Sequence, residues 1–129
     1  MNKVINFTTD FFVVHQNENI YNHHIYGLDL ARFLKAKLAE NSLVSGRIIQ
    51  EDFGFLIPFY KKPFTWIAVS SLEIKKDNLI TWSVFVNVEY SFWQNLFNRK
   101  NPADEKFGQQ LEDKIIEILT NHKFDLIIN

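Results

Sequence analysis

The sequence predicts an α+β fold, a two-layer sandwich in which two amphipathic helices cover one face of a mostly antiparallel sheet of five or six strands. Two observations lead to this prediction. The segment Leu79 to Tyr90 alternates apolar and polar side chains, a period of two that is typical of a strand with one buried face. Two other segments carry one apolar stripe each at helical spacing. Because such stripes must be buried against a second layer, we expect both helices to lie on the sheet.

The predicted order of elements is β-α-β-β-β-α-β. The first strand is expected over Val4 to Val14, with apolar residues on both faces of its second half. The polar run His15 to His24 reads as a loop. A helix should follow from Tyr26 to about Asn41, and its apolar stripe consists of Gly27, Leu30, Ala31, Leu34 and Leu38.

Three strands are expected next. The span Arg47 to Phe59 is broken by Gly54 and Pro58, so it forms one strand or a bulged pair, and Pro58 predicts a sheet edge or a bulge at that point. Phe64 to Ile74 forms the following strand. A four-residue polar turn leads from it into Leu79 to Tyr90, which is too short a connection for a parallel crossover. These two strands should therefore pair as an antiparallel hairpin.

The second helix has the clearest start signal in the chain. Asn101 stands at the expected N-cap and Pro102 at the first helical position. The apolar stripe that follows consists of Phe107, Gly108, Leu111, Ile115, Ile118 and Leu119. Phe124 to Asn129 reads as a short last strand. Since this strand follows a helix, we expect it to lie parallel to a neighbour, with the first strand as the candidate.

Composition limits the function classes. A length of 129 residues suits a single domain over residues 1–129, and a formal charge of -1 provides no global field for nucleic acid. The absence of cysteine excludes disulfides, thiolate metal sites and cysteine nucleophiles. No stretch reaches the roughly 18 to 20 apolar residues of a membrane-spanning helix, and no signal peptide is visible. We therefore expect a cytoplasmic protein without nucleic acid or membrane partners.

The most distinctive polar motif is Glu51 and Asp52, followed by Phe53, Gly54 and Phe55. Adjacent side chains of a strand point to opposite faces, so both acids can line one pocket only if Gly54 forms a bulge. In the functional interpretation, one acid is a partner anchor or a general acid/base beside the Phe residues. In the structural interpretation, both acids belong to a turn in which Asp52 accepts hydrogen bonds from nearby backbone N–H groups.

Part of this region resembles a known group of sequences. The helix pattern G-x-x-L-A-x-x-L at Gly27 to Leu34, followed by the acidic-aromatic-Gly-aromatic strand Glu51 to Phe55, is similar to small bacterial proteins of uncharacterised function, often with Trp where this chain has Phe. The resemblance covers Ile25 to Phe55, about a quarter of the chain. It implies a compact α+β domain and carries no activity, so no catalytic residue is transferred from it.

The four histidines are His15, His23, His24 and His122. The adjacent pair His23 and His24 could bind a metal if Glu18 or Asp29 converged on it, but the helical H-x-x-x-H spacing is absent. We predict no metal and no cofactor. The chain also has no G-x-S-x-G, P-loop or G-x-G-x-x-G pattern, so no catalytic residue is assigned and the protein is not expected to be an enzyme.

The strongest candidate for a binding surface is the aromatic connector after the strand Leu79 to Tyr90. Trp, Phe and Arg are the residues that most often anchor protein interfaces, and a segment between a strand and a helix is well placed to protrude. The alternative is that these aromatic residues belong to the edge of the core. The predicted partner-binding residues are Phe92, Trp93, Leu96, Phe97 and Arg99.

These observations rank protein binding first among the functions, with a toxin-neutralising immunity protein as its concrete form. A second hypothesis is a small-ligand-binding module with an apolar pocket between helices and sheet, lined by Phe residues, with Trp66 or Trp82 near its mouth. A third is a minor enzyme that uses Glu51 or Asp52 with a nearby His, and a purely structural domain is a fourth. Self-association through an unprotected strand edge, giving a homodimer, also stays open.

Overall fold

The structure is a computed structural model that describes residues 3–60, 64–76, 78–89 and 105–129. Within these residues the elements follow the predicted order, with the span Arg47 to Phe59 divided into two strands, so that four strands lie between the helices. The helices are α1 (Leu28–Glu40) and α3 (Lys106–Asn121). The strands are β1 (Val4–Thr9), β2 (Ile49–Glu51), β3 (Gly54–Phe59), β4 (Phe64–Lys76), β5 (Leu79–Glu89) and β6 (Ile127–Ile128).

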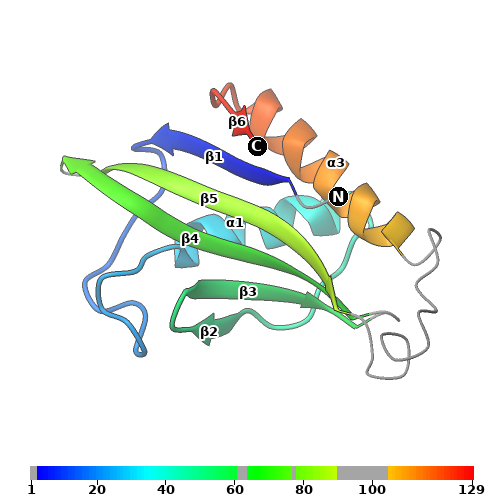
Figure 1. The fold of residues 1–129 in the computed structure, drawn as a ribbon, viewed down its shortest axis with the longest axis horizontal. Coiled ribbons are helices and arrows are strands. Elements are labelled where there is room, and N and C mark those ends of the chain that lie inside the picture. The colour runs from blue at the N-terminus through cyan, green and yellow to red at the C-terminus, as the bar shows by residue number, and fades with distance from the viewer. Residues whose placement is uncertain (1–2, 61–63, 77, 90–104) are drawn as a thin grey trace.

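The strands form one six-stranded sheet in the order β2-β3-β4-β5-β1-β6, and every neighbouring pair is antiparallel (Figure 1). The longest pairing joins β4 to β5, from Phe64 opposite Glu89 to Lys76 opposite Leu79. The predicted antiparallel hairpin is therefore confirmed. Two register shifts, near Ser71 and near Ile74, form bulges in the half of the hairpin that lies next to its turn. Such bulges increase the local twist of the strand.

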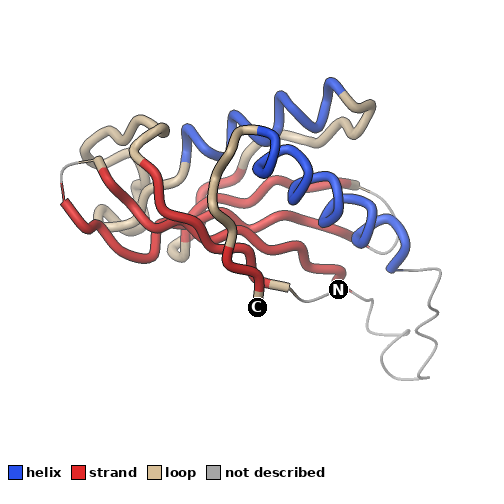
Figure 2. Tube along the Cα trace, turned by 90° about the horizontal axis from the view of Figure 1, so that it is seen from above, coloured by secondary structure: helices blue, strands red, loops and turns tan. Residues whose placement is uncertain are grey.

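Both described helices lie on the same face of the sheet, as Figure 2 shows. Helix α1 contacts β3, helix α3 contacts β5, and the two helices contact each other. This arrangement confirms the predicted α+β sandwich. It also defines a second face of the sheet, on the side away from α1 and α3, which we call the open face.

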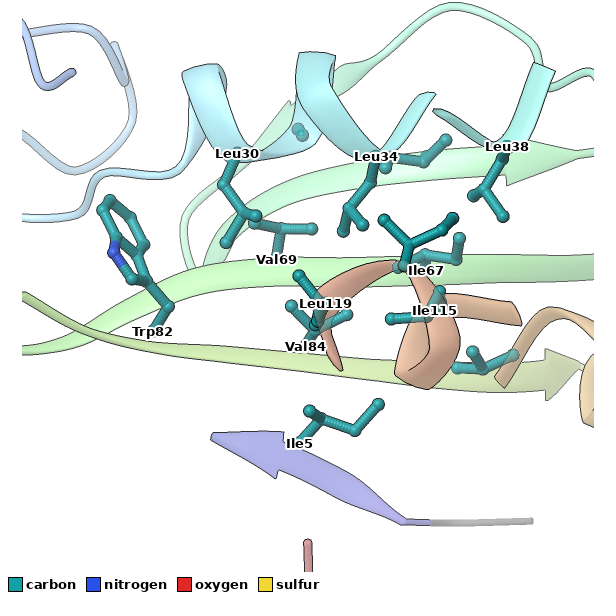
Figure 3. Close-up of a cluster of buried hydrophobic side chains, with 14 of the residues drawn as sticks. Ile5, Leu30, Leu34, Leu38, Ile67, Val69, Trp82, Val84, Ile115 and Leu119 are labelled. Atoms are coloured by element: carbon teal, nitrogen blue, oxygen red, sulfur yellow. The ribbon is translucent and has the colours of Figure 1, made fainter. Parts of the chain in front are cut away.

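The hydrophobic core fills the layer between the helices and the sheet (Figure 3). On β5 the predicted alternation holds, because Ile80, Trp82, Val84, Val86 and Val88 are all buried. The α1 stripe is buried through Leu30, Ala31, Leu34 and Leu38, and the α3 stripe through Leu111, Ile115, Ile118 and Leu119. Each helix thus buries the apolar stripe that its helical period predicts.

The first strand is shorter than predicted, because β1 ends at Thr9. The Thr9 side-chain oxygen accepts a hydrogen bond from the N–H of Phe11 at 3.1 Å, which bends the chain out of the strand. After the bend the alternation changes phase. Phe12 is buried and meets Trp82 edge-to-face, whereas Phe11 is 56% exposed.

Two further expectations about the sheet are wrong. The last strand, β6, does lie beside β1, but it is antiparallel to it, because the turn after α3 reverses the chain direction. Pro58 does not place β3 at an edge, because β3 lies between β2 and β4. The β2 ladder ends at Leu56, before Pro58, so the missing N–H of Pro58 interrupts no pairing with β2. The short strand β2 forms that edge instead.

Candidate functional site

Several predicted features lie outside the described residues. These are the start of the second helix at Asn101 and Pro102, and the partner-binding residues Phe92, Trp93, Leu96, Phe97 and Arg99. Their proposed roles stay predictions. The candidate site described here lies in the rest of the chain.

The motif around Glu51 and Asp52 forms the tight connection of the β2–β3 hairpin. Glu51 ends β2, Asp52 and Phe53 form the turn, and Gly54 begins β3. Gly54 has φ +148, and a Cβ at this position would overlap the Val69 carbonyl oxygen of β4. The glycine is therefore needed both for its backbone conformation and for the close approach of two strands.

A buried asparagine from the N-terminal loop braces this turn. The side-chain amide of Asn19 donates to the carbonyl of Glu51 at 2.8 Å and to the carbonyl of Gly54 at 3.1 Å. The side chain of Asn22 donates to the carbonyl of Asp52 at 3.3 Å. The loop thus recognises the backbone of the motif and not its carboxylates.

The two carboxylates themselves are not brought together for chemistry. Glu51 is half-buried, Asp52 is exposed, and neither side chain forms a hydrogen bond or an ion pair with any described residue. The hydrogen bond expected between the Asp52 carboxylate and backbone N–H groups is thus not found among these residues. The turn itself agrees with the structural interpretation of the motif.

The two acids proposed as metal ligands beside His23 and His24, Glu18 of the loop and Asp29 of α1, both accept hydrogen bonds from backbone groups. Glu18 accepts hydrogen bonds from the N–H groups of Gly27 and Leu28, both at 2.9 Å, and Asp29 accepts one from the N–H of Val13 at 2.8 Å. Within residues 3–60, 64–76, 78–89 and 105–129, no group of three or more His, Asp or Glu side chains could hold a metal ion.

An aromatic cluster lies on the open face of the sheet. Trp66 of β4 is in contact with Phe85 of β5, with ring centroids 5.9 Å apart, and with Phe53 of the β2–β3 turn, at 6.4 Å. Trp66 and Phe85 are half-buried, and Phe53 is 41% exposed. We call these three residues the aromatic cluster.

Other apolar residues lie on the open face beside this cluster, as the strand register shows. Residues opposite each other in a ladder share a face of the sheet. One such row crosses five strands, because Ile49 pairs with Leu56, Leu56 with Ala68, Ala68 with Phe85, and Phe85 with Val4. Among the described elements no helix covers this row, since α1 and α3 both lie on the opposite face.

Two carboxylates flank the apolar surface. Glu51 shares the open face with Ile49 on β2, and Glu89 shares it with Phe85 on β5. The indole N–H of Trp66 donates to the Glu89 carboxylate at 3.4 Å. Neither acid is in an ion pair with a described residue. The open face is therefore aromatic at its centre and acidic at its margins.

The two tryptophans proposed for the mouth of a ligand pocket point to opposite faces. Trp82 is 1% exposed and fills space in the core beside Phe12, whereas Trp66 lies on the open face. Core side chains from the helices and the sheet, among them Leu34, Val69 and Val84, occupy the layer where that pocket was expected (Figure 3).

The sequence suggests Trp66 for the mouth of a ligand pocket and Phe53 as part of the acidic motif, but it does not group these residues with Phe85, although one signal is present. Phe85 is an apolar residue among the polar side chains Thr81, Ser83, Asn87 and Glu89, with which it alternates on one side of its strand, and Trp66 lies in the opposite alternating set to Ile67. An apolar residue in the outward set of a strand indicates a covered or partner-binding face.

Comparison with protein-family models, with curated proteins and with solved structures finds no match to this chain. In the part of the chain that the structure describes, no helix is long and apolar enough to cross a membrane.

Proposed function

We propose that the protein acts by binding another protein, and that the open face of the sheet makes the contact. The observation that supports this proposal is the aromatic cluster of Phe53, Trp66 and Phe85, which lies on the face opposite α1 and α3. Trp and Phe provide large contact areas at low entropic cost, and they are common in the centre of protein interfaces.

The chemistry of the open face supports a basic partner. Glu51 and Glu89 have no cationic partner among the described residues, so a basic surface with apolar side chains at its centre would complement both the charge and the aromatic cluster. The concrete form of this role is neutralisation of a toxin whose functional surface is rich in Arg and Lys. Covering such a surface requires no catalytic group on this chain.

The test begins with affinity capture from the native lysate with the tagged wild type, a Trp66→Thr, Phe85→Thr double variant and a Leu72→Thr control. Thr favours strand structure, so the double variant should remain folded. Leu72 is 57% exposed on the same strand, β4, and lies outside the aromatic cluster. Circular dichroism verifies the fold of all three proteins. The captured protein is then purified, and its affinity for the wild type, the double variant and the control is measured by calorimetry.

We expect one basic protein to bind the wild type and the Leu72→Thr control equally, and to bind the double variant at least about tenfold more weakly. Its affinity should also fall with added salt, since the complex pairs opposite charges. The proposal is wrong if the folded double variant binds the partner as tightly as the wild type. A dimer in light scattering that the double variant abolishes would instead assign the face to a second copy of this chain.

A further inference from the structure

A cationic groove lies outside the open face, between α1 and the segment that leads into β2. It consists of two adjoining cavities of about 390 Å³ and 360 Å³, which share Arg32 and Lys35. Arg47 lines the first cavity, and Ala36, Ala39 and Val44 line the second. The groove is therefore cationic at one end and apolar at the other.

The cations of this groove lack carboxylate partners. Lys35 is held in place by three uncharged acceptors, since its ammonium donates to the Ser45 hydroxyl at 3.0 Å and to the carbonyls of Ser45 and Gly46 at 3.3 Å and 2.7 Å. Arg32 and Arg47 form no hydrogen bond or ion pair with any described residue. No described Asp or Glu lines either cavity.

This arrangement differs from that of the other basic side chain on α1. Lys37 on the same helix lies 3.6 Å from Glu40 and forms an ion pair. The chain has 15 acidic and 14 basic residues, so carboxylates are not scarce. Three cationic residues line one concave surface without a carboxylate, which leaves a local positive charge that a bound anion would neutralise.

We propose that the groove binds a small amphipathic anion, a phosphate or carboxylate headgroup that carries an alkyl chain. Arg32 and Arg47 would donate hydrogen bonds to the headgroup, and Lys35 would add charge from the groove wall. The chain would lie along Ala36 and Ala39 toward Val44. Cavities of this size are typical of small-ligand sites.

The length of the groove indicates the length of the ligand. From Arg32 to Ala39 the helix rises by about 10 Å, which is close to the extended length of an eight-carbon chain. Octyl phosphate is therefore the probe of choice, with inorganic phosphate as the headgroup alone and octanol as the chain alone. The site does not depend on the proposed protein partner, because that partner occupies the open face.

The experiment measures binding of the three probes to the purified protein by calorimetry at low salt. The test variant is Arg32→Gln, Arg47→Gln, and the control is Lys76→Gln, Lys106→Gln, which removes the same charge at exposed positions outside the groove. A third variant, Ala36→Glu, adds a carboxylate to the groove at an exposed helical position that tolerates Glu.

We expect saturable binding of one octyl phosphate, weakened about tenfold or more in the arginine variant and in Ala36→Glu but unchanged in the lysine control. Inorganic phosphate and octanol should each bind at least about tenfold more weakly than octyl phosphate. Equal binding of octyl phosphate to all variants, or no binding at all, would overturn the proposal. An acidic peptide is titrated in the same way, and tighter binding of this peptide than of octyl phosphate would also overturn the proposal, because it would make the groove a protein-binding site.

Discussion

Among single residues, Asn19 makes the most hydrogen-bond contacts between the N-terminal loop and the β2–β3 turn. Its side chain is fully buried, although the loop is polar. Its amide donates to the carbonyls of Glu51 and Gly54, and its carbonyl oxygen accepts from the N–H groups of Tyr21 at 2.9 Å and Asn22 at 3.2 Å. Both amide hydrogens and the acceptor oxygen are therefore used. This one side chain joins the N-terminal loop to the β2–β3 turn.

Replacing Asn19 with Ala should destabilise the fold by roughly 2 to 4 kcal/mol, because buried backbone groups on both sides lose their partners. The measurement is urea unfolding followed by circular dichroism. Gln16→Ala is the control, since Gln16 is exposed in the same loop and should change the stability by less than about 0.5 kcal/mol. If both variants lose a similar amount of unfolding free energy, the Asn19 hydrogen bonds contribute little to stability.

At the scale of single elements, helix α1 is capped from a distant position in the sequence. Its N-cap residue, Gly27, has no side chain with which to cap the first turn. Instead the Glu18 carboxylate accepts from the N–H groups of Gly27 and Leu28, and it lies at the positive end of the helix dipole. The same side chain accepts from the N–H of His15, so it fixes the loop and the helix together.

Glu18→Ala should therefore cost about 1 to 2 kcal/mol of stability, and Glu18→Gln less, because the amide oxygen can still accept while the charge is lost. Thermal and urea unfolding check this order. Glu117→Ala is the matched control, because it removes a 57% exposed carboxylate paired with Lys114 on α3, a surface ion pair worth less than about 1 kcal/mol. A loss for Glu18→Ala no larger than this control would contradict the capping role.

At the scale of the whole molecule, one connected core joins both helices to the sheet. Buried residues of α1, α3, β1, β3, β4 and β5 belong to the same cluster, in which Leu34 and Ile115 represent the two helices. Because the two helices contact each other and bury their stripes in one shared core, neither is expected to unfold independently. We expect a single cooperative transition.

Leu34→Ala and Ile115→Ala should each lower the unfolding free energy by about 2 to 5 kcal/mol, since both side chains are fully buried and leave cavities. Circular dichroism and tryptophan fluorescence should report the same midpoint for each variant. Leu72→Ala, at a 57% exposed position, should change stability by less than about 0.5 kcal/mol. Separate midpoints from the two probes would show that α1 or α3 unfolds on its own.

Elements whose residues repeat at short range could be predicted from the sequence alone. The alternation from Ile80 to Val88, the stripe from Leu30 to Leu38 and the polar turn between β4 and β5 each encode a local conformation and the side that must be buried. These patterns predict the element order, the hairpin and the two-layer arrangement. Helices and strands with one apolar side can bury those sides together in only a few arrangements.

The contacts between distant elements could not be predicted from the sequence. The capping of α1 by Glu18 uses backbone N–H groups, which every residue except proline has, and the Asn19 amide donates to backbone carbonyls, which every residue has. No sequence pattern therefore marks their targets. The aromatic cluster and the groove between Arg32 and Arg47 likewise join side chains from separate elements. Periodicity shows how one segment folds, but such surfaces depend on strand register and helix placement, which long-range packing sets.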